Sequence, residues 1–334
     1  MSENKTSGQP ILSPGDIMGM ASFQRSRILL TAYELGLFTV IGDSHKTSVE
    51  VSNALGTDRR ATDRLMNALV AIGLLTKEDD TFTNTPGAAQ LLVKGKPDYM
   101  SGLMHTANLW ESWSTLTVAV RRGTSVPRPE VNDRGDGWLR AFISAMHYRA
   151  TIQAPGSIAM LDLNGVKRVL DVGGGSGAYS MAFARAKEDL TAVVFDLPNV
   201  VALTQEFIES EGLLGKVTTV AGDYNTDTFP GGFDIVYLSA IIHSNSPDEN
   251  NELFRKCYDA LNPKGRLVIQ DFIVDPSRTN PPFAAIFALN MLVGTNAGDT
   301  FTEEEVREWM HAVGLNDIIR EDTPFDTTLI IGSK

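Results

Sequence analysis

The spacing of apolar residues divides the chain into a helical first half and a mixed second half. Up to about residue 160, apolar positions recur every three or four residues, the period of one buried face of an α-helix. This pattern predicts helices over residues 17–37, 48–55, 58–72, 88–123 and 138–161. Beyond residue 165, short apolar runs alternate with helical patterns, which is typical of a parallel sheet covered by helices.

The second half of the chain predicts an open α/β sheet. Strands are expected at seven apolar runs: 168–172, 191–196, 217–221, 233–239, 266–272, 316–323 and 327–332. A helix over 302–313 precedes the last two runs, which the short link Pro-Phe-Asp joins as an antiparallel pair. The expected fold is α/β, with a Rossmann-like, doubly wound, mostly parallel seven-stranded sheet, an antiparallel edge hairpin and a mainly helical N-terminal domain.

Two helices and a hairpin in the first hundred residues predict a winged helix-turn-helix. A glycine separates the helices over 48–55 and 58–72, and the runs 74–77 and 81–84 flank a Glu-Asp-Asp turn. Such a module binds DNA in some proteins and only protein partners in others, because a fold does not fix a function. We expect three parts: a winged-helix dimerisation domain over 1–100, linking helices over 101–160 and an α/β domain over 161–334.

The charge distribution argues against a nucleic-acid partner. The formal net charge is −12 and the isoelectric point is about 4.9, whereas phosphate binding needs a basic face. The arginines of the second winged helix, Arg59, Arg60 and Arg64, are interleaved with Asp58 and Asp63. A DNA-binding regulator that senses a ligand stays as an alternative, which salt-dependent DNA binding would reveal.

Composition indicates one large or two ordinary domains with sizeable cores. The chain has 334 residues, of which 43% are hydrophobic. No apolar run has the length of a membrane span, and residues 1–14, expected as a loose arm, lack the apolar core of a signal peptide. The single cysteine, Cys257, has no partner for an intrachain disulfide. We therefore expect a cytoplasmic protein without a membrane partner.

A glycine-rich turn follows the first strand of the second half. Residues 171–177 read Asp-Val-Gly-Gly-Gly-Ser-Gly, and Asp196 ends the next strand. This order, in which a strand, a glycine turn, a helix and a second strand lead to an acid, is typical of a nucleotide site. The alternative is a glycine turn that only reverses the chain. Asp171 stands where a pyrophosphate would bring negative charge, so a cationic nucleoside fits better. S-adenosylmethionine, with an ammonium and a sulfonium, is the cofactor we expect.

Polar side chains follow the carboxyl ends of the strands, where ligands of such sheets bind. Asp196 is placed to bind two ribose hydroxyls, and Asp223 to accept from an adenine amino group. Leu197 and Tyr224 would cover the faces of the adenine, and Ser239 ends the fourth strand. For each acid, a helix cap or a solvated loop charge is the alternative.

His243, a few residues after the fourth strand, is the candidate general base. Imidazole is the side chain whose ordinary pKa suits a base near neutral pH. Asp271, at the end of the adjacent strand, would orient the imidazole and stabilise its charged form. A purely structural histidine is the alternative. No carboxylate cluster with ligand spacing accompanies the pair, so we expect no metal.

These residues resemble those of a known family. Over nearly its full length the chain is similar to the class I S-adenosylmethionine-dependent O-methyltransferases of the plant caffeate and bacterial small-molecule type. Five segments carry the resemblance: residues 171–177, Phe195-Asp196-Leu197-Pro198, Gly222-Asp223, Ile241-Ile242-His243 and Leu289-Asn290-Met291-Leu292. The resemblance implies that Gly173 and Gly175 line the methionine end of the cofactor.

The resemblance also implies an acceptor pocket and a homodimer. Phe142 and Met146 match pocket positions in the helix before the α/β domain, and Asn290 and Met291 match a pocket-lining helix. The N-terminal domain would exchange helices with a second subunit, which completes each pocket. The implied reaction is methyl transfer to a hydroxyl oxygen of a small aromatic or polycyclic acceptor, with His243 as the base.

Some positions depart from the family pattern. The two residues after the base are Ser244 and Asn245, where the family usually has Asp and Trp, and Ser239 stands where Lys is common. The loop after the pocket helix offers Asp299 beside Thr300, the position in register with a second acid. Methylation of nitrogen or carbon, or a structural use of the cofactor, therefore stays as an alternative, and the acceptor is not identified.

Overall fold

The computed structural model describes residues 12–127 and 135–334 and divides the chain into two compact units, Met1–Ala107 and Asn108–Lys334. The expected division at residues 100 and 160 stays a prediction. Of the expected N-terminal arm, residues 1–11 lie outside the described residues, as do 128–134 of the loop expected over 124–137.

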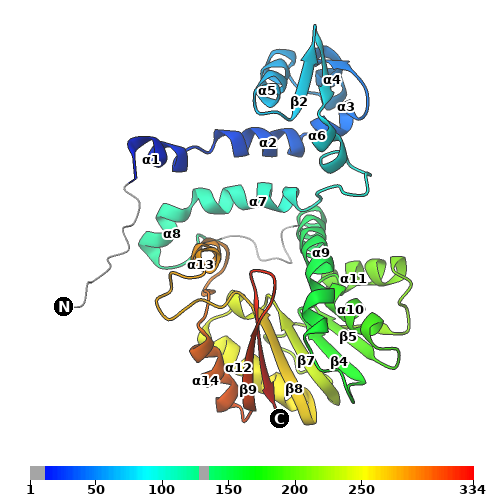
Figure 1. Ribbon diagram of the computed structural model, residues 1–334, viewed down its shortest axis with the longest axis vertical. Helices are drawn as coiled ribbons and strands as arrows, with labels where there is room; N and C mark the ends of the chain where they lie inside the picture. The colour runs from blue at the N-terminus through cyan, green and yellow to red at the C-terminus, as the bar shows by residue number, and fades with distance from the viewer. Residues whose placement is uncertain (1–11, 128–134) are drawn as a thin grey trace, which may run out of the picture. The chain divides into compact units, whose positions relative to one another are not determined.

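The N-terminal unit consists of helices and a small three-stranded sheet of order β1-β3-β2 (Figure 1). Its elements are α1 (Pro14–Met20), α2 (Gln24–Glu34), α3 (Leu37–Ile41), β1 (Lys46–Thr47), α4 (Ser48–Leu55), α5 (Arg59–Ala71), β2 (Leu75–Glu78), β3 (Thr81–Asn84) and α6 (Pro86–Leu91). The expected helix pair and hairpin are confirmed. Asp58 caps α5 by accepting from the Ala61 N–H at 2.8 Å, and Phe38, Met66 and Phe82 are buried in the core.

The single helix expected over residues 17–37 is wrong. The chain forms α1, α2 and α3 instead: α1 ends at Met20, and α2 ends at Glu34. Gly36 then adopts a φ of 73°, in the left-handed region that interrupts a right-handed helix. No residue of α1 is buried.

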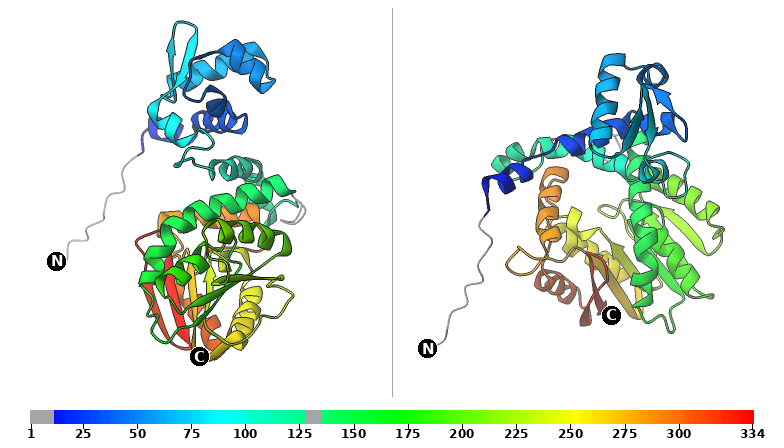
Figure 2. Two further views of the ribbon diagram at one scale, coloured as in Figure 1. Left: turned by 90° about the vertical axis from the view of Figure 1, so that its right-hand side faces the viewer. Right: turned by 45° about the horizontal axis from the view of Figure 1, so that its top comes forward.

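The C-terminal unit is built around a seven-stranded sheet (Figures 1 and 2). Its strands are β4 (Arg168–Val172), β5 (Thr191–Asp196), β6 (Val217–Ala221), β7 (Phe233–Ser239), β8 (Leu261–Asp271), β9 (Asn316–Asp322) and β10 (Thr328–Ser333). Their order is β6-β5-β4-β7-β8-β10-β9, and β10 runs antiparallel to both of its neighbours. The expected mostly parallel sheet with an antiparallel edge hairpin is confirmed.

The expected start of β8 at Arg266 is wrong. The strand begins at Leu261, which pairs with Phe233 before a register shift. The helices of this half are α7 (Leu103–Ser114), which spans the boundary between the units, α8 (Leu116–Arg122), α9 (Asp136–Ala159), α10 (Ala178–Ala186), α11 (Pro198–Ser210), α12 (Pro247–Ala260), α13 (Pro282–Gly294) and α14 (Glu303–Ala312).

Alternate residues of the central strands face two different hydrophobic layers. Leu170 and Val236 pack with α12 and α14, whereas Val169 and Ile235 pack with α9, α10 and α11. Cys257 lies inside the first layer, where burial raises the pKa of its thiol and makes it inert. The strand order reverses between β4 and β7, and crevices for ligands lie beyond the carboxyl ends of the strands at such a point.

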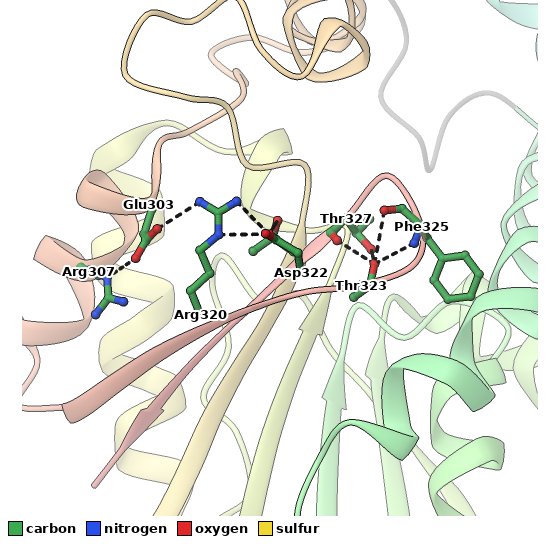
Figure 3. Close-up of polar contacts among 8 residues, drawn as sticks. Glu303, Arg307, Arg320, Asp322, Thr323, Phe325 and Thr327 are labelled. Carbon is green, nitrogen blue, oxygen red and sulfur yellow. Dashed lines mark hydrogen bonds and ion pairs between the residues drawn. The ribbon is translucent and has the colours of Figure 1, made fainter.

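The loop between β9 and β10 is held by hydrogen bonds of its own (Figure 3). The Thr323 hydroxyl donates to the Thr327 carbonyl at 2.6 Å and accepts from the Phe325 N–H at 3.2 Å. On β9, Arg320 donates to Glu303 of α14 at 3.0 Å. The contacts of Thr323 fix the loop. Thr327 of the same loop lines a cavity at this end of the sheet.

Candidate active site

A cavity of ≈ 250 Å³ lies at the carboxyl ends of β4, β5, β7 and β8, against one face of α9. The predicted residues that line it are Asp171, Gly173, Gly175, Asp196, Leu197, Tyr224, Ser239, Phe142 and Met146. The predicted residues that lie outside its lining are Asp223, His243, Asp271, Asn290 and Met291. A larger hollow of ≈ 550 Å³ along α9 and α10 contains none of the predicted residues. The smaller cavity is therefore the candidate active site.

The glycine turn after β4 forms one wall of the cavity with its main chain. Gly173 and Gly175 have φ angles of 65° and 56°, which glycine adopts without strain. A Cβ atom at Gly174 would lie 2.7 Å from the carboxyl carbon of Asp171. The Gly173 N–H donates to the Phe195 carbonyl at 2.8 Å and ties the turn to the end of β5. A ligand can therefore approach the backbone closely here.

Asp171 is completely buried beneath the glycine turn. Its Oδ2 accepts from the Ser180 hydroxyl at 2.8 Å, while its Oδ1 has no hydrogen-bond partner among the described residues. Burial raises the pKa of Asp171 to about 7. In the protein alone, this acid is therefore fully charged only above neutral pH, and a cationic ligand would favour loss of its proton.

Asp196, at the end of β5, is held by two main-chain N–H groups. Gly175 donates to Oδ2 at 2.8 Å and Leu197 donates to Oδ1 at 2.7 Å. An ionised carboxylate has about four acceptor sites, so acceptor capacity remains for two ligand hydroxyls. Burial raises the pKa of Asp196 to about 6. A buried acid beside the turn and a second acid with spare acceptor sites fit an adenosyl cation.

Asp223 lies in the turn after β6 and outside the cavity lining. Its carboxylate accepts from the Asn225 N–H at 2.8 Å, and its own N–H donates to Asp227 at 2.8 Å. Lys256 of α12 holds this turn by donating to the carbonyls of Tyr224 and Asn225, at 2.9 and 2.8 Å. Tyr224 faces the cavity, and the adenine contact of Asp223 stays a prediction.

His243 stands on the short 3₁₀ helix η2 (Ile242–Ser244) that follows β7, with its Nδ1 2.7 Å from Oδ1 of Asp271. Because a carboxylate only accepts hydrogen bonds, Nδ1 carries the proton and Nε2 keeps its lone pair. The Phe272 N–H donates to the same Asp271 oxygen at 2.8 Å. The Phe287 ring packs edge-on to the imidazole, with 4.9 Å between the centroids. The side chain is only 10% exposed, which fits an oriented base.

A chain of polar side chains holds the turn that carries His243. Asn250 of α12 donates to the Ile242 carbonyl at 2.9 Å and accepts from Asn245 at 3.1 Å. Asn245 in turn accepts from the Tyr224 hydroxyl at 3.2 Å. Asn245 is one of the departures from the family pattern, and here it joins the wall of the cavity to the turn that carries His243.

The predicted acceptor residues lie in two different environments. Phe142 and Met146 are one helical turn apart on α9 and both line the cavity. Asn290 on α13 accepts from the indole N–H of Trp113 at 3.0 Å, and Met291 is buried. The acceptor contacts of these four side chains stay predictions.

Asp299 does not lie against His243 as a second acid. Its carboxylate is 48% exposed and lies 3.6 Å from Arg278, while the neighbouring Thr300 is buried. In the part of the chain that the structure describes, Asp271 is the one acid in hydrogen-bond contact with His243.

Some polar residues of the cavity belong to no sequence motif and were not predicted: Arg149, Gln153, Tyr179, Gln270 and Thr327. Helical spacing from Met146 identifies the first two, because they follow on the same face of α9. The other three come from separate elements that only the fold brings together. Gln270 donates to Tyr179 and to Thr327, both at 3.0 Å.

Within residues 12–127 and 135–334, no three His, Cys, Asp or Glu side chains are grouped as a metal site. The same residues include no helix with the length and apolar character of a membrane span.

Family comparisons cover both units of the chain. The O-methyltransferase domain family matches residues 123–316, and the O-methyltransferase dimerisation domain family matches residues 18–94. These two regions together include the glycine turn, the strand ends, the base and the expected winged helix.

Individual relatives match over nearly the whole length. The 3-hydroxy-5-methyl-1-naphthoate 3-O-methyltransferase of Streptomyces sahachiroi is 33% identical, over 93% of this chain and 92% of its own. The tetracenomycin polyketide synthesis 8-O-methyl transferase TcmO of Streptomyces glaucescens is 29% identical, over 97% and 98%. The solved structure of PigF with SAH has a TM-score of 0.88 at 24% identity, over 97% and 100%, and it supports the fold.

Proposed function

Since the chain belongs to the S-adenosylmethionine-dependent O-methyltransferase family, we propose that it methylates a phenolic hydroxyl of an aromatic or polycyclic small molecule, with His243 as the general base. Methyl transfer to oxygen is the activity for which the matched domain family and the two relatives described above are named, and the acceptor class and the roles of the residues are proposed. The observation that carries the proposal is the buried pair of His243 and Asp271 beside a cavity whose acids fit the cofactor.

The donor would be held by the strand ends. Asp196 would accept from the ribose hydroxyls, the main chain of Gly173 and Gly175 would line the methionine end, and Asp171 would balance the positive charge. Tyr224 would cover one face of the adenine. When bound, S-adenosylmethionine supplies a methyl group that its positive sulfur already activates.

The base would act through Nε2 of His243. Asp271 fixes the tautomer by accepting from Nδ1, so Nε2 is free to take the proton of an acceptor hydroxyl. The imidazolium formed would be stabilised by the same carboxylate. Such proton transfer contributes roughly 10²–10⁴-fold to the rate, and in-line positioning contributes the rest.

The acceptor class is supported by the aromatic lining and by two relatives. Phe142 and Phe272 line the cavity, and Phe283 stacks against Phe287 beside Phe272. The names of the two relatives state action on a hydroxynaphthoate and in tetracenomycin synthesis, which are fused-ring molecules. Flat rings pack on such a wall in offset or edge-on geometry.

Incubation of the purified protein with S-adenosylmethionine and a panel of naphthols, hydroxyanthraquinones, aryl amines and aliphatic alcohols tests this proposal. We expect a mass gain of one methyl group on the phenols and formation of S-adenosylhomocysteine, unchanged when a metal chelator is present, because an imidazole base needs no metal. Methylation confined to the amines or to ring carbon, or no turnover of any phenol, contradicts it.

We also propose that the chain is a homodimer through its N-terminal unit. The dimerisation family matches residues 18–94, and α1 exposes Ile17, Met18 and Met20, followed by an exposed Phe23. Contiguous apolar residues of this kind are normally covered by a partner. Sedimentation equilibrium should give twice the 36.3 kDa mass of the chain. A monomer mass at micromolar concentration contradicts the dimer.

A further inference from the structure

Arg149 places a positive charge inside the candidate active site. It follows Met146 on the cavity face of α9 and lines the same cavity. Its guanidinium carbon lies 4.7 Å from the centroid of the Phe272 ring and 5.9 Å from that of Phe283. The cation therefore lies against an aromatic wall, where contact with a ring face is favourable.

This cation has no counter-ion in direct contact. Among residues 12–127 and 135–334, no carboxylate forms an ion pair with Arg149, and no acceptor binds its N–H donors. Asp271 and Asp326 act on it only through space, and burial outweighs them and lowers the pKa of Arg149. A guanidinium stays charged in proteins and has five donors, so an unpaired one in a cavity favours binding of an anion.

The same aromatic wall contacts the base. The Phe272 ring lies 5.8 Å from the imidazole of His243, and the Phe287 ring lies 4.9 Å from that imidazole and 4.5 Å from Phe272. Arg149 and His243 thus both contact one ring. A flat acceptor packed on this wall would present one edge to the base and another edge to the guanidinium.

We propose that Arg149 binds a carboxylate on the aromatic ring of the acceptor and thereby selects hydroxyaryl acids as substrates. This inference rests on the proposed function and adds the substrate class. The guanidinium fork matches a carboxylate with two parallel N–H···O bonds, which gives orientation as well as affinity. The methionine carboxylate of the cofactor is the competing anion, and the experiment separates the two.

The test compares two acceptors that differ only at the acid: a hydroxynaphthoic acid and its methyl ester. For the wild type, we expect kcat/KM to favour the acid. Arg149→Met keeps the bulk of the side chain and removes the fork, so the acid-to-ester ratio should fall roughly 10–10²-fold, mostly through the KM of the acid. Arg149→Lys keeps the charge without the fork, so its acid-to-ester ratio of kcat/KM should lie between those of the wild type and Arg149→Met.

A matched control and the cofactor affinity make the result decisive. Arg140→Met removes a cation from the same helix, where Arg140 pairs with Glu206 at 2.8 Å on the surface, and should leave the ratio unchanged. The Kd for S-adenosylhomocysteine should be unchanged in all three variants. A wild-type ratio near one, an unchanged ratio in Arg149→Met, or a weaker Kd that accounts for the loss overturns the inference. Failure of the wild type to methylate either phenol overturns the proposed function instead.

Discussion

His243→Ala should lower kcat by roughly 10²–10⁴-fold on a phenol that is neutral at the assay pH. The reason is the geometry of the pair: Asp271 accepts from Nδ1 at 2.7 Å, and Nε2 is the group left to take the acceptor proton. Binding of S-adenosylmethionine should be unchanged, because His243 lies outside the lining of the cofactor cavity. Single-turnover kinetics and calorimetry of cofactor binding measure the two effects separately.

Two comparisons show whether the loss comes from the missing base. His311→Ala removes an imidazole from the last turn of α14, where it contacts the Leu315 carbonyl, and should leave kcat at the wild-type value. A nitrophenol that is already ionised at the assay pH should recover most of the activity of His243→Ala, because it needs no base. If His243→Ala keeps the wild-type rate on a phenol with a pKa of about 10, the base is another group.

Asp196→Asn should weaken cofactor binding by roughly 10²-fold or more. The carboxylate accepts from Gly175 and Leu197, and its remaining acceptor sites face the cavity. An amide of the same shape turns one acceptor into a donor, which repels a main-chain N–H and loses charge-assisted bonds to ribose, each worth about 1.5–3 kcal/mol. At saturating cofactor, kcat should change little. Asp189→Asn, in the exposed loop before β5, is the control and should bind as the wild type does.

The pH dependence of cofactor binding provides a second signature of Asp196. Burial raises the pKa of Asp196 to about 6 and that of Asp171 to about 7, and the cationic cofactor prefers both groups ionised. Affinity should therefore rise as pH increases from about 5 to about 7.5, below the titration of the ligand amine. In Asp196→Asn, the rise in affinity near pH 6 should disappear, and the rise near pH 7 that we assign to Asp171 should remain. A flat wild-type profile contradicts the assignment of both acids.

The same pKa shifts have the opposite sign for folding. Each carboxyl is harder to ionise in the folded chain than in the unfolded one, where its pKa is about 3.9. Their contribution to stability is therefore fully present below that value and is lost as pH rises through about 6 and about 7. Ionised, these two acids are thus a cost to the fold near neutral pH, and a cofactor bound as proposed would offset that cost.

Sequence patterns predicted the sheet well, because buried parallel strands are short apolar runs that end at glycines and acids. Strand β4 and the glycine turn are an example, since the residues that end the strand are also those that line the cavity. The same patterns failed for residues 17–37, where apolar positions continue but the chain leaves the helix after Met20 and again at Gly36, whose φ is 73°. Periodicity reports which face is apolar, and it does not report what covers that face.

The candidate site was predictable wherever a side chain follows a strand end, and not where separate elements meet. Asp171 and Asp196 were identified from position alone. Gln270 and Thr327 were not, because the hydrogen bond between them depends on how β8 lies beside the β9–β10 loop. In the sequence, Asn245 is a departure from the family pattern. In the structure, it links Tyr224 to the turn that carries His243.

The position of α9 has a consequence for how enzymes of this design change their specificity. In the proposed site, the donor would be held by the ends of strands, whose side chains are packed on both faces, so substitutions there disturb the core. Met146, Arg149 and Gln153 instead lie on one face of a helix that covers the sheet, where each side chain is half-buried and lines the cavity. Because they share the cavity with the proposed donor residues, their substitutions should couple with those at the strand ends, and double-mutant cycles measure that coupling. Libraries confined to this face of α9 therefore test the proposed acceptor contacts while the strand ends stay unchanged.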